Sequence, residues 1–345
     1  MRRLPTVVLL ALTACGLGPT QLRTDRINYT EAIADSWKKQ MLLNIVKLRY
    51  MDAPVFLDVQ QILAGYTLEG SASAGWSENG LAQGWTTGGT GRFINRPTIT
   101  YRPVSGAEFA KSFMTPIPPS AVIFLMQAGY AADYLFPLCV QSINGLRNYS
   151  GTKSMQGDAD DRFVQLVKAL AKAQASGAVG LRVEQKGATS ATVLVFPKQD
   201  ADPESDALVR EITELLRLEP GRSEFKVEYS TAPGGSDKIV MLTRSALTIM
   251  FELAVQVDVP EEHSRKGYTV PAPPVDEAIR LIRVHSGTSN PGKDAFVAIQ
   301  HEDHWFWIRK DDLAAKRTFS FIRLLFGFVD KGAPPPPTLV TVPAG

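Results

Sequence analysis

Cysteine is scarce in this chain, and its two copies, Cys15 and Cys139, narrow the chemistry that is open to it. If Cys15 is chemically modified, Cys139 has no partner and no disulfide can form within the chain. Cys139 lies in an apolar run, where a free cysteine behaves as a small buried hydrophobe rather than as a nucleophile. The sequence has no C-x-x-C pair either, so it predicts no redox pair and no cysteine-based metal site.

The chain also has no large net charge. The formal net charge of the chain is +2, and removal of residues 1–14 would take away Arg2 and Arg3 but no acidic residue, which leaves a charge of zero. Proteins that bind nucleic acid through its phosphates carry a basic surface. The composition therefore predicts no nucleic-acid partner.

Signatures of catalysis are absent as well, including G-x-S-x-G and H-E-x-x-H. Residues 287–293 match the spacing of a phosphate-binding loop, but Asp294 stands where a magnesium-binding hydroxyl is needed and a strand should follow. A hairpin turn is the better interpretation. Residues 301–304 (His-Glu-Asp-His) are interpreted as a solvated turn rather than a metal site, because His263 and His285 have no evident reason to converge on them.

Three further groups invite a functional interpretation. The carboxylates of residues 158–161 and 311–312 stand directly before predicted helices, where N-capping explains them. Residues 305–307 (Trp-Phe-Trp) alternate two aromatic faces on one strand; one tryptophan could stack on a sugar, but coverage by sheet and helix is the favoured interpretation. We predict no catalytic, cofactor-binding or metal-binding residue, while an acid/base pair dispersed in the sequence stays open.

The most informative segment is the N-terminus. Arg2 and Arg3 precede a short apolar stretch, Val7–Leu12, which is too short to span a bilayer, and the small residues Thr13 and Ala14 then precede Cys15. Residues 1–15 resemble the lipobox signal peptide of bacterial lipoproteins. The resemblance implies transfer of diacylglycerol to the Cys15 thiol, cleavage before Cys15 and acylation of the new amine.

Three acyl chains exceed the two signals that stable anchoring requires, so the first expected partner is membrane lipid, bound through acylated Cys15. In this family the next residue helps to sort the product, and Gly16 is not the aspartate associated with retention in the inner membrane. The resemblance therefore favours the periplasmic face of the outer membrane over the inner membrane.

Hydrophobic periodicity predicts an α+β fold, with antiparallel sheets and helices packed on one face, preceded by a helix and a long β-hairpin. A helix should begin near Asn28 and carry an apolar stripe to Leu48, and residues 65–101 alternate as a hairpin around Glu78-Asn79-Gly80. The predicted organisation begins with a cleaved signal peptide (1–14) and a tether (15–27). A region with a helix, a hairpin and further helices at 105–114 and 119–145 follows (28–157), and then an α-β-β repeat-like region (158–257). The rest is a Pro-rich linker or loop (258–275), a β-β-β-α region (276–330) and a disordered Pro-rich tail (331–345).

Three functions are compatible with these features. The first is a noncatalytic lipoprotein of the cell envelope that binds or scaffolds an envelope protein. The second is an enzyme with dispersed acidic residues that acts on envelope polysaccharide or peptidoglycan. The third is an oligomeric outer-membrane assembly that uses the 65–101 hairpin, whose alternation and length suit a membrane strand.

Overall fold

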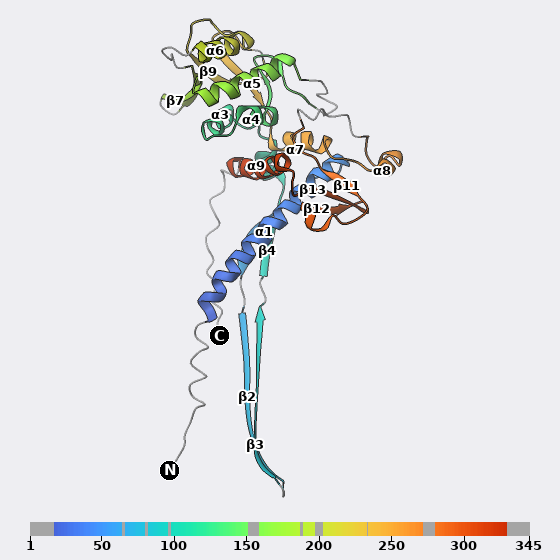
Figure 1. Ribbon diagram of the computed structural model, residues 1–345. Helices are drawn as coiled ribbons and strands as arrows, with labels where there is room; N and C mark the ends of the chain where they lie inside the picture. The colour runs from blue at the N-terminus through green and yellow to red at the C-terminus, as the bar shows by residue number, and fades with distance from the viewer. Residues whose placement is uncertain are drawn as a thin grey trace. The chain divides into compact units, whose positions relative to one another are not determined.

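The computed structural model describes residues 17–63, 66–79, 82–95, 98–150, 159–186, 189–196, 203–232, 234–271 and 280–329. The chain divides into two compact units: residues 1–33 and 55–105 form unit 1, and residues 34–54 and 106–345 form unit 2. The fold is α+β, as predicted, and an N-terminal helix precedes the strands (Figure 1). Among the described residues no helix is both long enough and apolar enough to cross a membrane.

The first helix, α1, runs over Leu17–Arg49. Residues 17–27, predicted to be a tether, are therefore helical, and the helix does not begin at Asn28. Pro19 is compatible with the helix because it lies in the first turn, where the backbone N–H groups have no intrahelical partner and a proline removes no hydrogen bond.

The C-terminal part of α1 lies in unit 2 and contributes to its core. The predicted apolar stripe is confirmed here by the burial of Met41, Ile45 and Leu48. Arg49, at the end of the helix, is also buried. Its Nη2 donates to the carbonyl of Val270 at 2.8 Å, and its own carbonyl accepts from Thr269 Oγ1 at 2.6 Å.

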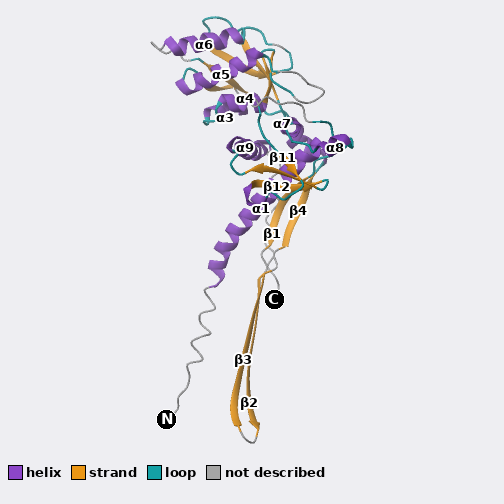
Figure 2. Ribbon diagram, turned by 45° about the vertical axis from the view of Figure 1, so that its right-hand side comes forward, coloured by secondary structure: helices purple, strands orange, loops and turns teal. Residues whose placement is uncertain are grey.

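Unit 1 contains the long hairpin that the alternating sequence predicts. It consists of β1 (Phe56–Leu63), β2 (Tyr66–Asn79), β3 (Ala82–Asn95) and β4 (Thr98–Val104), with β1 antiparallel to β4 and β2 antiparallel to β3. Figure 2 shows β2 and β3 as one ribbon of two long strands. Its register pairs Trp76 with Trp85, on either side of the predicted turn. Gly80 of that turn is outside the described residues.

The larger sheet of unit 2 has the strand order β6-β5-β10-β9-β8-β7. Its strands are β5 (Val140–Ile143), β6 (Leu146–Arg147), β7 (Gly180–Lys186), β8 (Thr189–Val195), β9 (Glu224–Tyr229) and β10 (Lys238–Thr243). Along β9, Phe225 and Val227 are buried while Lys226 and Glu228 are exposed, so one face is covered and the other meets solvent at this strand. This matches the prediction of helices on one face.

One strand pair departs from the antiparallel pattern. The predicted antiparallel sheet would set β10 beside β9 in the opposite direction, but β9 and β10 are parallel, with Lys238 beside Lys226. The connecting loop is tied back by a bond from the Glu219 N–H to the Ser236 carbonyl at 2.9 Å. Asn144 then holds the start of β10, since its Oδ1 accepts from the Val240 N–H at 2.7 Å.

The helical segment predicted at 105–114 is present as a short α2 (Gly106–Phe109) that continues as a π-helix, Ala110–Met114. The segment predicted as helical at 119–145 is helical in α3 (Pro119–Gln127) and α4 (Ala132–Cys139), but the prediction is wrong for its last residues, which form the strand β5. Gly129, with φ of 98°, breaks the helix, because that conformation is open to glycine but strained for other residues.

The predicted helices of the α-β-β region are confirmed as α5 (Asp161–Ser176), α6 (Pro203–Leu215) and α7 (Ala246–Val255). The C-terminal region forms a second sheet, β11 (His285–Gly287), β12 (Ala295–His301) and β13 (His304–Arg309), followed by α9 (Leu313–Val329). Residues 258–275, predicted as a linker, include the short helix α8 (Glu261–Arg265) and two buried side chains, His263 and Thr269.

Candidate functional site

Of the two cysteines, only Cys139 is among the described residues. Cys15, the predicted lipidation site, lies outside the described residues. Cys139 ends α4 and is fully buried, and burial raises the pKa of its thiol to about 12. A thiol so far from its ionised form is a poor nucleophile at neutral pH, which agrees with its interpretation as a packing residue.

The loop with phosphate-loop spacing holds no helix that could bind an anion. Gly287 ends β11, and residues 292–294 form one turn of 3-10 helix before β12 begins at Ala295. The loop is not a hairpin turn, contrary to the prediction, because β13 lies between β11 and β12. The side chain of Asn290 closes it locally by accepting from the Gly292 N–H at 2.9 Å.

The His-Glu-Asp-His segment forms the predicted tight turn, with His301 paired to His304 across the β12–β13 hairpin. Glu302 and Asp303 have positive φ angles of 47° and 59°, as a two-residue hairpin turn requires. The same turn contacts a part of the chain that the sequence had not linked to it. The His304 ring lies 4.4 Å from that of His263, which comes from α8.

Tyr50, just beyond α1, is the centre of this histidine cluster. Its hydroxyl lies 2.5 Å from Nδ1 of His263, and its ring makes edge-to-face contacts with His263 at 5.6 Å and His301 at 5.0 Å. Burial raises the pKa of Tyr50 to about 12 and lowers the pKa of both His263 and His301. The cluster therefore favours a neutral phenol and neutral imidazoles. Uncharged side chains suit the buried place where the segments of Tyr50, His263 and His301 pack together.

The cluster does not have the geometry of a metal centre. Among the described residues, no group of three or more His, Cys, Asp or Glu side chains could hold a metal ion. His263 Nδ1 is already engaged by Tyr50, and the nearest carboxylate to His301 Nε2 is Asp52, at 3.8 Å. Sequence reasoning missed the convergence because Tyr50 and His263 are more than two hundred residues apart.

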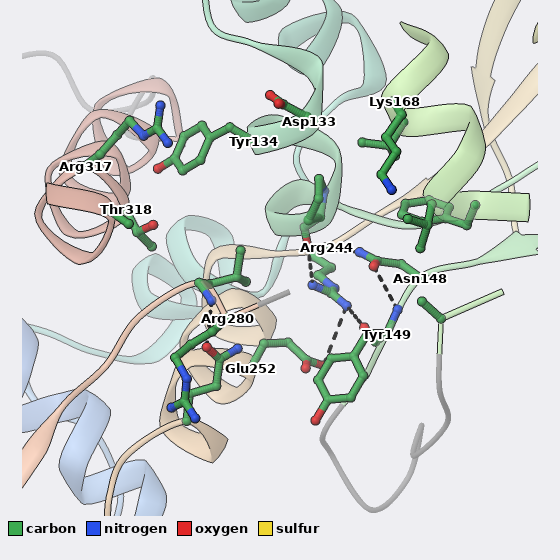
Figure 3. Close-up of a pocket in the computed structure, with 18 residues that line it drawn as sticks. Asp133, Tyr134, Asn148, Tyr149, Lys168, Arg244, Glu252, Arg280, Arg317 and Thr318 are labelled. Atoms are coloured by element: carbon green, nitrogen blue, oxygen red, sulfur yellow. Dashed lines mark hydrogen bonds and ion pairs between the residues drawn. The ribbon is translucent and has the colours of Figure 1, made fainter. Parts of the chain in front are cut away.

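A cavity of about 350 Å³ in unit 2 is a second candidate for a binding site (Figure 3). It is lined by side chains of α4, α5, α7 and α9 and by residues 280–281. Arg317 of α9 lies over the Tyr134 ring at 4.7 Å, on one side of the cavity. Gln256 lies at the end of α7, where its Oε1 accepts from the Leu281 N–H at 2.8 Å.

Arg244 is the most heavily bonded cation of this cavity, and Figure 3 shows it between Asn148, Tyr149 and Glu252. Its Nη1 donates to the Pro137 carbonyl at 2.9 Å, and its Nη2 donates to the Tyr149 carbonyl. Nη2 also lies 3.9 Å from Glu252 Oε1, and both side chains are almost fully buried. Burial lowers the pKa of Arg244, and Glu252 opposes that effect.

These bonds give Arg244 a structural task. The Pro137 carbonyl belongs to the last turn of α4, which leaves its carbonyl groups without helical partners, and a cation there also faces the negative end of the helix dipole. Glu252 in turn accepts from Ser150 Oγ at 2.7 Å. The buried charges of the cavity are thus occupied in holding the end of α4 and the segment after β6.

The acidic clusters behave as the sequence predicted where they are described. Asp160 caps α5, with Oδ1 accepting from the Arg162 N–H at 2.9 Å, and Asp312 Oδ1 accepts from the Ala315 N–H at the start of α9. Asp158 is outside the described residues. An ion pair with Arg309 lowers the pKa of Asp311. Among described carboxyl groups with a displaced pKa, none is raised, so the raised acid of a glycosidase pair finds no support there.

The aromatic strand is half covered. Phe306 is fully buried, while Trp305 and Trp307 on the opposite face are half-buried, and Trp307 stacks on His285 at 5.7 Å.

No protein family, curated protein or solved structure matches the chain. The function must therefore be argued from the geometry of this chain alone.

Proposed function

We propose that this chain is a lipid-anchored lipoprotein of the bacterial cell envelope that binds or scaffolds an envelope protein without catalysing a reaction. The observation that carries the proposal is the β2–β3 ribbon. Each strand has 14 residues, and within the described residues β2 and β3 pair only with each other. A ribbon of two strands is marginally stable alone in water, so its length is best explained by a partner.

The anchor in this proposal is the lipid on Cys15. The resemblance of residues 1–15 to a lipobox supports it, and Gly16 favours the periplasmic face of the outer membrane. Three acyl chains would hold the protein stably at the membrane surface. The binding surface would then act where its partner is confined to the same envelope.

A role in catalysis receives less support from the described residues. The cavity beside Arg244 has its two buried charges engaged with backbone carbonyls, with Ser150 and with each other. An enzyme that cleaves polysaccharide needs two carboxyl groups with different protonation states, one of them raised in pKa. The polysaccharide-acting alternative is therefore second to a binding role.

Acyl labelling tests the anchor. Wild type and Cys15→Ala are grown with a labelled fatty acid, and the envelope is fractionated. Cys139→Ala is the matched control, because it removes the buried thiol and leaves Cys15 in place. We expect label and membrane association in wild type and Cys139→Ala, and no label in Cys15→Ala. A labelled Cys15→Ala chain would contradict the anchor.

Crosslinking in intact envelopes tests the binding role. We expect the wild-type chain to be captured together with an envelope protein, and a chain shortened by removal of residues 66–95 to lose that partner. The residues on either side of the deletion, in β1 and β4, already pair with each other, since Leu63 lies beside Thr98. Recovery of the wild-type chain free of any crosslinked protein would contradict a scaffolding role.

A further inference from the structure

The β2–β3 ribbon lacks three of the features that protect the edges of a sheet. Natural edge strands avoid pairing by carrying proline, lysine or a bulge. The β2–β3 register runs from Tyr66 beside Asn95 to Asn79 beside Ala82 without a shift, and the two strands contain neither proline nor lysine. The adjoining β1–β4 pair differs, because it has an irregularity at Val59 and carries Pro103.

One face of the ribbon carries exposed polar side chains. The register sets Glu69 opposite Arg92 and Ser71 opposite Thr90, and these four residues are exposed. The hydroxyl oxygens of Ser71 and Thr90 lie 2.6 Å apart. Alternate positions of a strand lie on opposite faces, so residues 68, 70, 72, 74 and 76 belong to the other face.

The sequence of that second face has the layout of a membrane strand. Paired Leu68 and Phe93 stand at one end, paired Trp76 and Trp85 at the other. Between them the positions carry Gly, Ala or Thr and no charge (residues 70, 72, 74, 87, 89 and 91). From one of these levels to the other each strand has nine residues (68–76 and 85–93), which is within the ~9–11 residues that a tilted strand needs to cross a bilayer.

We propose that β3 of one copy of this chain pairs with β2 of the next copy, and that the sheet so formed spans a lipid bilayer. The inference rests on the proposed function, because lipid anchors in one leaflet give all copies the same direction. Between such copies, β3 meets β2 antiparallel, whereas β2 would meet β2 parallel. The charges of the polar face agree: β2 carries Glu69 and β3 carries Arg92.

This pairing is head to tail, so each copy uses one edge toward one neighbour and the other edge toward the next. Such an interface closes into a ring when its rotation permits. The outer edge of β3 then pairs with the outer edge of β2 in the next copy, and such pairing between strands satisfies backbone groups in lipid. The polar face, with Glu69 and Arg92, would line the water-filled side of that sheet.

Cysteine crosslinking between copies tests the pairing in the full-length anchored protein. Differently tagged chains are produced together, one with Thr90→Cys and the other with Glu69→Cys, Ser71→Cys or Ser73→Cys, and the envelopes are oxidised. The native Cys139 is buried and should not react. We expect a disulfide-linked pair carrying both tags in at least one combination. The control pair, Ser289→Cys with Ser320→Cys, joins exposed positions of unit 2 and should give none.

Accessibility to a membrane-impermeant maleimide tests the bilayer contact. The membrane vesicles are permeabilised so that the reagent reaches both sides of the bilayer. Ser71→Cys should then be labelled at least tenfold faster than Ala72→Cys, and the difference should vanish after denaturation. Equal labelling of the two positions would overturn the bilayer contact, and absence of every inter-copy disulfide would overturn the pairing. If no inter-copy disulfide forms while the wild-type chain keeps its acyl label and captures another envelope protein, the proposed function stands. If disulfide-linked copies form but carry no acyl label, the result would contradict only the lipid anchor on Cys15.

Discussion

Replacement of Arg244 by methionine should destabilise unit 2 strongly. Methionine fills much of the volume of the arginine stem but offers no donor to the Pro137 and Tyr149 carbonyls. It also removes the cation 3.9 Å from the Glu252 carboxylate, at a site where both side chains are buried. Loss of one partner of a buried ion pair costs about 3–5 kcal/mol, a large part of the ~5–15 kcal/mol that holds a typical domain folded.

Guanidinium unfolding, followed by tryptophan fluorescence and circular dichroism, measures this loss. Glu252→Gln is the milder comparison, because it keeps an acceptor for Ser150 and leaves the carbonyl bonds of Arg244 intact; we expect a loss of about 1–3 kcal/mol. The double variant Arg244→Met/Glu252→Leu should lose less than the sum of its single changes, since no unpaired charge remains buried. A loss below ~1 kcal/mol for Arg244→Met, the range of an exposed ion pair, would refute a structural role for Arg244.

Three further outcomes are expected. Burial lowers the pKa of His263, His285 and His301 in the folded chain. As the pH falls, these histidines are therefore protonated in the unfolded chain before they are protonated in the folded chain. The free energy of unfolding, measured by denaturant titration, should be level above about pH 7 and fall below ~6.5, by at most ~1.4 kcal/mol per pH unit for each histidine; a level curve down to pH 5 would contradict their burial. The buried Cys139 should react with a thiol reagent only after denaturation, and rapid reaction of the native chain would show that it is accessible. Asp160→Ala should cost ~1 kcal/mol by calorimetry, because α5 loses its cap, whereas an unchanged melting temperature would show that the cap is dispensable.

Elements set by local periodicity could be predicted from the sequence. The alternation of residues 65–101 predicted the hairpin because a half-exposed ribbon needs one polar and one apolar face, and the register confirms it. The helices α5 and α9 were predicted from apolar stripes and capping carboxylates, and Phe163 and Phe319 are buried on those stripes. In each case the signal lies within a few turns of chain.

Elements set by distant partners could not be predicted. Residues 140–143 continue an apolar helical pattern, yet they form β5 because β10, about a hundred residues later, offers an edge: Ile143 lies beside Met241. The direction of β10 itself depends on Asn144, whose Oδ1 accepts from the Val240 N–H and whose Nδ2 donates to the Leu216 carbonyl. A turn sequence such as Gly234-Gly235 permits a reversal but does not decide which neighbouring strand the chain joins.

The histidine cluster shows the same limit for a candidate site. Ligand-like spacing drew attention to His301 and His304, but spacing within a hairpin turn says nothing about what packs against it. The structure brings Tyr50 and His263 to that turn, and the bond between them occupies Nδ1 of His263, one of its two ring nitrogens. A polar group is available for binding only when the fold has not already used it, and for His263, as for Arg244, the fold has used it. On the β2–β3 ribbon, each of the two long strands pairs with no strand but the other within the described residues, and we therefore expect the function to lie there.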